Sequence, residues 1–332
     1  MSKIASIAAA ATIATLSSLF IKSAAADNLK VVSTFSIISD FAKNVGGDRI
    51  DLTTLVGPDG DAHVYEPKPA DGAALSEADV VLVNGLQFEG FLDRLVEASE
   101  TKAPIVELTK GVEPLRAMDE EHEHEHEHEG EAAEGHDHDH EHEEEHEHEE
   151  GHHHHGEFDP HAWQSVHNAE IYVTNISAAF CSVDQAGCDV YKSNAEAYLA
   201  KLKALETSVK AELADIPADK RTVITSHDAF GYFEHEYGLK FLAPEGISTE
   251  AEASAADVAK LIDQIKEDKA SALFVENITN TALIDQISAE TGLKVGGTLY
   301  SDALSGPSEP AATYIDMMNH NVATLKKAIT GN

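Results

Sequence analysis

The sequence predicts an α/β protein in which two lobes, each built on a mostly parallel sheet flanked by helices, are joined by one long rigid helix. In both halves of the 332-residue chain, short β-branched runs alternate with amphipathic helical runs, a pattern typical of parallel sheets covered by helices. Between the halves, residues 189–216 are rich in Ala, Leu, Glu and Lys and contain no Gly or Pro, which favours an uninterrupted helix. The length also suits two domains rather than one.

The expected elements divide the mature chain into an N-terminal lobe (27–188), the linking helix (189–216) and a C-terminal lobe (217–332). Hydrophobic periodicity and flanking Gly, Pro or polar residues place each element. A single helix of this length is stiff, so the two lobes should resist wide hinge motion. The predicted strands cover 30–34, 51–57, 79–85, 104–108, 221–226, 239–243, 272–277 and 293–297, and the predicted helices lie near 36–47, 88–98, 228–236, 253–268, 281–290 and 309–328.

The first 26 residues have the features of a secretory signal peptide. Lys3 supplies the positive start, residues 4–21 are mostly apolar, and three alanines that end at Ala26 fit cleavage before Asp27. There is no cysteine near this point to carry a lipid anchor. Further along the chain we find no apolar stretch of the roughly 18 residues that a membrane span needs. We therefore expect an exported protein, located in the periplasm.

The two cysteines, Cys181 and Cys188, lie seven residues apart. In an oxidising compartment such a pair is expected to form a disulfide that closes a small local loop. A metal site built on both thiols is the less favoured interpretation because the C-x-x-C spacing is missing.

Residues 119–157 form an insertion with nineteen acidic residues and no Lys or Arg. The insertion has too few apolar residues for their burial to offset the entropy cost of ordering the chain, and we therefore expect a disordered, solvated loop. Neutral imidazole binds zinc, copper and nickel, and the carboxylates concentrate cations, which predicts weak metal binding at several places. The histidines concerned are His122, His124, His126, His128, His136, His138, His140, His142, His146, His148, His152, His153, His154 and His155.

Several function classes are disfavoured by the same residues. Residues 122–126 match H-E-x-x-H, but a zinc protease needs this motif on a helix with an apolar face, which the insertion lacks. The formal charge of −37 makes nucleic acid and anionic membranes poor partners. We find no nucleophile–base set, phosphate-binding loop or dinucleotide motif, so the chain is not expected to be an enzyme.

Three histidines and one aspartate lie in loops near the predicted strands. His63 and His227 each follow a strand, Asp302 comes after the strand at 293–297, and His161 follows the insertion. Ligands of α/β folds bind outside the carboxyl ends of the strands. Three imidazoles and one oxygen ligand form a tetrahedral set suited to zinc, and imidazole disfavours manganese relative to zinc. Glu276, at another strand end, is expected to support a ligand rather than to be one.

The segments GDAHVYEP, DPHAW, TSHDAFGYF, FVENITN and GTLYSDALS, in this order, resemble the cluster A-I metal-binding solute receptors of ABC importers. The acidic His-rich insertion before DPHAW is similar to that of the zinc-specific, ZnuA-like branch. The resemblance covers essentially the whole mature chain. It implies two α/β lobes bridged by a long helix, with the metal in the cleft between them.

The family's ligand positions fall on His63, His161 and His227. In manganese receptors the third of these is usually Glu, so His227 favours zinc. Some zinc receptors place a Glu directly before the first histidine; here that residue is Ala62, which leaves Asp302 or water as the fourth ligand, and we favour Asp302.

The resemblance implies a monomeric periplasmic receptor that delivers Zn²⁺ to an ABC permease, with a cytoplasmic ATPase subunit using the ATP. A manganese or iron receptor of the same fold is the alternative. A zinc hydrolase is a second alternative, and it would need an open metal position and a nearby base.

Overall fold

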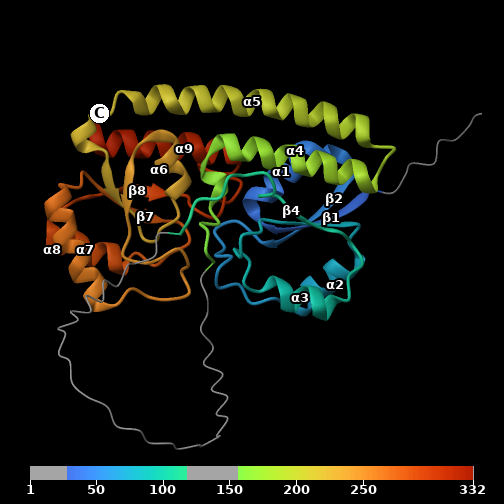
Figure 1. Ribbon diagram of the computed structural model, residues 1–332, viewed down its shortest axis with the longest axis horizontal. Helices are drawn as coiled ribbons and strands as arrows, with labels where there is room; N and C mark the ends of the chain where they lie inside the picture. The colour runs from blue at the N-terminus through green and yellow to red at the C-terminus, as the bar shows by residue number, and fades with distance from the viewer. Residues whose placement is uncertain (1–27, 118–155, 332) are drawn as a thin grey trace, which may run out of the picture.

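The computed structural model describes residues 28–117 and 156–331, which form two α/β lobes beneath a long helix (Figure 1). The predicted signal peptide and nearly all of the predicted His-rich insertion lie outside the described residues. Within the described part, no helix is both long and apolar enough to cross a membrane.

The N-terminal lobe contains a parallel four-stranded sheet in the order β2-β1-β3-β4. Its central strand β1 is buried at six of its seven residues, as expected for a strand covered on both faces. The elements are β1 (Leu29–Phe35), α1 (Ser36–Gly46), β2 (Ile50–Val56), α2 (Pro69–Glu77), β3 (Val80–Val83), α3 (Leu92–Ser99), β4 (Ile105–Glu107) and α4 (Val166–Val183), with short 3-10 turns at Gly47–Arg49 and Ala162–Gln164.

The C-terminal lobe repeats the same topology. Its parallel sheet has the order β6-β5-β7-β8, so β5 and β7 correspond to β1 and β3 of the first lobe. In both sheets the chain order reverses at the central pair, the position where open α/β sheets bind ligands. The elements are β5 (Thr222–Ile224), α6 (Gly231–Tyr237), β6 (Lys240–Leu242), α7 (Ala255–Asp268), β7 (Leu273–Glu276), α8 (Ala282–Thr291), β8 (Val295–Leu299) and α9 (Tyr314–Thr330), preceded by a 3-10 turn at Ala218–Lys220.

The long helix is α5 (Cys188–Ala214), which runs across both lobes in Figure 1 and packs on α1, α4 and α9. Its observed bounds lie within two residues of the predicted range, 189–216. A single apolar core continues from the N-terminal lobe through α5 and α9 into β5 and α6, and a second, smaller cluster fills the outer part of the C-terminal lobe. A continuous apolar contact between lobes opposes their separation more strongly than a polar interface would.

Cys181 near the end of α4 and Cys188 at the start of α5 form the predicted disulfide, with their Cα atoms 4.5 Å apart. The bond closes the turn at which the chain reverses between these two packed helices. The helix α2 was not predicted, and it has almost no amphipathic periodicity. The helix α4 begins at Val166, after the 3-10 turn at Ala162–Gln164.

Candidate metal centre

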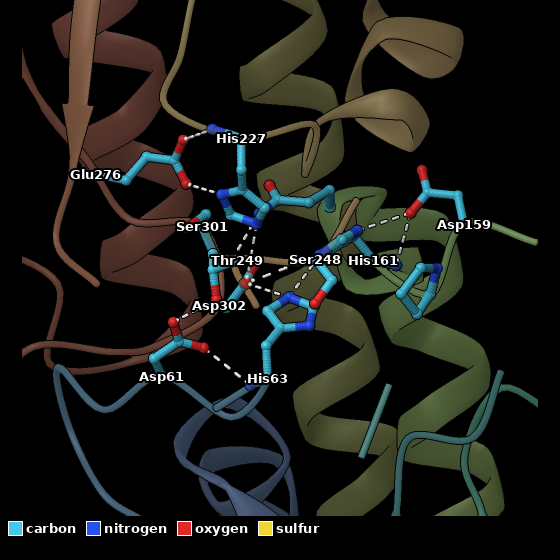
Figure 2. A network of polar contacts seen from close by, with 12 residues as sticks. Asp61, His63, Asp159, His161, His227, Ser248, Thr249, Glu276, Ser301 and Asp302 are labelled. Carbon is cyan, nitrogen blue, oxygen red and sulfur yellow. Dashed lines mark hydrogen bonds and ion pairs between the residues drawn. The ribbon is translucent and has the colours of Figure 1, made fainter. Parts of the chain in front are cut away.

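Four side chains from separate segments converge between the two lobes (Figure 2). His63 lies in the loop after β2, and His161 lies just before the 3-10 turn that leads into α4. His227 follows β5, and Asp302 follows β8. These are the four residues that the sequence singled out. His63, His227 and Asp302 follow strands, and the carboxyl ends of the strands in each parallel sheet lie on one edge.

The potential ligand atoms all lie within 4.8 Å of one another. Oδ2 of Asp302 is 3.2 Å from Nε2 of His63, 3.2 Å from Nε2 of His227 and 3.7 Å from Nε2 of His161. Nε2 of His161 is 3.4 Å from Nε2 of His63. For a tetrahedral zinc ion with the usual bond lengths, neighbouring ligand atoms are about 3.3 Å apart. The four separations given above lie close to this value, so the cluster can surround a single tetrahedral cation.

The cluster is shielded from solvent. His161, His227 and Asp302 are fully buried, and His63 retains 7% of its surface. Among the described residues, Oδ1 of Asp302 has no hydrogen-bond partner, an expensive arrangement for a buried carboxylate. A bound cation would compensate this carboxylate, which fits a metal site.

Carboxylates behind the ring nitrogens orient two of the histidines. Oδ1 of Asp159 accepts from the backbone N–H of His161 (2.9 Å) and lies 2.8 Å from its Nδ1. Oε2 of Glu276 lies 2.6 Å from Nδ1 of His227, and its Oε1 accepts from the backbone N–H of Ser226 and of His227. With Nδ1 engaged in this way, Nε2 of each ring is directed at the cluster, the usual arrangement around metal-binding histidines. Glu276 lies behind His227 rather than among the four converging groups.

The charges of the cluster also depend on burial. Burial lowers the pKa of His161, but the negative charge of Asp302 and the hydrogen bond with Asp159 outweigh this effect and raise it to about 9. For His227, the charges of Glu276 and Asp302 likewise overcome burial and raise the pKa well above 6.5. Burial raises the pKa of Asp302, yet the two histidines lower it well below its usual value. Asp302 is therefore ionised at neutral pH.

A buried hydrogen-bond network ties two of the ligand segments together across the lobes. The backbone carbonyl of Ser301 accepts from Nε1 of Trp163 (2.9 Å) and from Nε2 of Gln164 (2.7 Å). Ser301 directly precedes Asp302, and both donors follow His161 within three residues. The relative position of His161 and Asp302 is thus fixed by direct contacts and not by the long helix alone.

The profile of the family described as "Zinc-uptake complex component A periplasmic" (ZnuA) matches residues 31–328. The chain belongs to this family. This is a family of periplasmic components of metal-uptake systems rather than of enzymes, so this chain is a metal-binding transport protein.

Named relatives of this ZnuA-family receptor carry different metals in their names. The iron-binding protein YfeA of Yersinia pestis is 33% identical, over 96% of this chain and 95% of YfeA. The manganese-binding lipoprotein MntA of Halalkalibacterium halodurans is 32% identical, over 92% of this chain and 89% of MntA. The structure of the periplasmic zinc-binding protein TroA from Treponema pallidum matches with a TM-score of 0.77 and 26% identity, over 92% of this chain and 99% of TroA. These names support a location outside the cytoplasm.

The sequence analysis did not single out Asp159, although this carboxylate orients His161 of the cluster. The signal was present, since Asp159 lies two residues before His161 inside the DPHAW segment. We expect Asp159→Asn to weaken metal binding about 10–100-fold, the usual effect of losing a carboxylate that orients a ligating histidine. Titration against a chromophoric chelator measures this change. An affinity equal to that of the unmodified protein would contradict the orienting role.

Proposed function

We propose that this protein binds Zn²⁺ through His63, His161, His227 and Asp302 and delivers it to the permease of an ABC importer, whose cytoplasmic ATPase subunit supplies the energy. The observation that carries the proposal is the convergence of three imidazole nitrogens and one carboxylate in a buried cluster of tetrahedral size. All four groups come from one chain, which supports a monomer. The receptor would work in the periplasm after signal cleavage near Ala26.

The donor set supports zinc over manganese and iron. Imidazole suits zinc, carboxylate and water suit manganese, and affinities of nitrogen–oxygen sites rise from Mn²⁺ through Fe²⁺ to Zn²⁺. The relatives named for iron and manganese support the alternative, a receptor of the same fold for those metals. Competition titrations with the purified protein distinguish the two. Zinc should displace bound Mn²⁺ and Fe²⁺ at equimolar concentration, whereas retention of either against zinc supports the alternative.

The fourth ligand in this proposal is Asp302. Its ionised carboxylate would offset the charge of the cation, so Asp302→Asn should lower zinc affinity while the three histidines stay in place. X-ray absorption spectroscopy at the zinc edge, on the zinc-loaded variant, gives the number of nitrogen ligands. Competition with a chelator gives the zinc affinity. Unchanged affinity would contradict Asp302 as a ligand and would point to water in the fourth position.

We further propose that the His-rich insertion, residues 119–157, gathers zinc for the cluster. The many histidines and carboxylates of the insertion should each bind zinc weakly and exchange it quickly, whereas the four residues of the cluster are brought together when the protein folds. Zinc would then pass from the insertion to the cluster along a gradient of affinity. The described residues resume at Gly156, three residues before Asp159, so the C-terminal end of the insertion lies close to the cluster.

Deleting residues 119–157 should leave one tight zinc site and reduce the total zinc bound. Metal analysis of dialysed protein and calorimetric titration measure both quantities. The complementary control keeps the insertion and carries His161→Ala, which should retain only weak binding. Loss of tight binding in the deletion variant would make the insertion part of the primary site and would contradict the proposed hierarchy.

A further inference from the structure

The loop that carries His63 belongs to the N-terminal lobe but is hydrogen-bonded to the C-terminal lobe. Asp59 accepts from Nδ2 of Asn277 (2.9 Å), and its backbone N–H donates to the carbonyl of Leu304 (2.9 Å). Nδ2 of Asn277 also lies 3.3 Å from the carbonyl of Ala303, next to Asp302. One end of the loop is thereby attached to the segment that holds another ligand.

Two residues further along this loop, the two carboxylate oxygens of Asp61 accept hydrogen bonds from opposite lobes (Figure 2). Oδ1 accepts from the backbone N–H of His63 at 2.8 Å, within the N-terminal lobe. Oδ2 accepts from the hydroxyl of Thr249 at 2.6 Å, in the C-terminal lobe. A short hydrogen bond to a charged acceptor is stronger than one between neutral groups. Asp61 thus links the position of a ligand to the position of the facing lobe.

Thr249 lies in the segment after β6, which also reaches His227. Glu245 of this segment pairs with His227 in an isolated parallel bridge, and its backbone N–H donates to the carbonyl of Ser226. Residues 245–249 therefore extend from His227 in the C-terminal lobe to Asp61, which lies beside His63 in the N-terminal lobe.

This contact lies on the side of the cluster that faces solvent. His63 is the one of the four converging residues that keeps any exposure, and it lines a cavity of about 650 Å³ together with Ile247, Ser248 and Glu250. An ion that leaves the cluster on this side must pass between His63 and residues 247–250. The hydrogen bond from Thr249 to Asp61 joins these same two segments.

We propose that the Asp61–Thr249 hydrogen bond holds the two segments together over the bound metal, so that Asp61 is a positioning residue that slows metal release. The inference rests on the proposed metal-binding role of the cluster. The bond contributes after the ion has entered, because it closes the side on which the ion leaves. It should therefore affect the dissociation rate more than the association rate.

Thr249→Val tests the proposal, because it removes the hydroxyl and leaves the bond from His63 to Asp61 in place. The matched control is Thr249→Ser, which keeps a hydroxyl at the same position. Zinc-loaded full-length proteins are mixed with excess chromophoric chelator in a stopped-flow instrument, which gives the dissociation rate. The association rate and the melting temperature of the metal-free protein are measured in parallel.

We expect Thr249→Val to release zinc about tenfold faster, which is near the lower end of what the loss of a hydrogen bond to a charged acceptor causes. Its association rate should stay within about twofold of that of the unmodified protein. Thr249→Ser should resemble the unmodified protein. In an Asp61→Ala background, Thr249→Val should add no further acceleration, because the acceptor is already absent. This non-additivity separates the interlobe bond from a general loosening of the segment.

Equal dissociation rates for Thr249→Val and the unmodified protein would overturn the inference, as would additive effects of the two substitutions. A lower melting temperature with an unchanged dissociation rate would also overturn it and would give Thr249 a purely structural role. Failure of the unmodified protein to bind zinc would instead reject the proposed function.

Discussion

His161→Ala is expected to abolish tight zinc binding while the protein remains folded. His161 is fully buried, and its Nε2 lies 3.4 Å from that of His63 and 3.7 Å from Oδ2 of Asp302, so its ring borders the centre of the cluster. Removing a direct ligand should cost more than the roughly 10–100-fold attributed to residues behind the ligands, so we expect an affinity loss above about 1,000-fold. Chelator competition measures the loss.

His167→Ala is the matched control for this experiment. His167 lies six residues after His161, is exposed on α4, and is not one of the four converging groups. It should leave the affinity unchanged, and both variants should keep the circular dichroism spectrum of the unmodified protein. If His161→Ala retained tight binding in the folded state, the assignment of the cluster as the primary metal site would be wrong.

Zinc binding at pH 7 is expected to release about two protons from the cluster. The pKa of His161 is raised to about 9 and that of His227 well above 6.5, so both rings are in the doubly protonated, positively charged form in the metal-free protein at this pH. Zinc binds neutral imidazole, so it must displace one proton from each of the two rings. The apparent affinity should therefore rise about 100-fold per pH unit near neutrality, and less steeply above about pH 9, where His161 is already neutral.

Calorimetric titrations in two buffers with different ionisation enthalpies count the released protons. The stability of the metal-free protein supplies a control, because it should change with pH in the direction opposite to the zinc affinity. Because both folded-state pKa values lie above the unfolded value of about 6.5, the two histidines stabilise the metal-free fold below that pH. The contribution of His161 is lost as the pH rises through about 9. The melting temperature of the metal-free protein should fall over that range while zinc affinity rises. A proton count near zero would contradict the raised pKa values.

The sequence was sufficient for the alternating strands, the long helix and the four converging residues. Strands such as β1 are dense in β-branched residues, and α5 lacks Gly and Pro from end to end, so local chemistry decides these elements. His63, His227 and Asp302 could be found because they follow strands, and the carboxyl edge of a parallel sheet brings such positions together. The helix α2 escaped prediction because it is stabilised by its neighbours rather than by a periodic apolar face.

The tertiary structure decided which histidine each supporting carboxylate orients. A supporting role for Glu276 was expected from the sequence, but only the fold shows that Glu276 orients His227 and that Asp159 orients His161. Thr249 and Asp61 are 188 residues apart, and no local pattern relates them. Local propensity and periodicity act over a few residues, whereas hydrogen bonds between lobes depend on how the assembled sheets meet. The sequence by itself therefore determined the elements and the ligand candidates, and packing of the two lobes determined how those candidates are oriented and held.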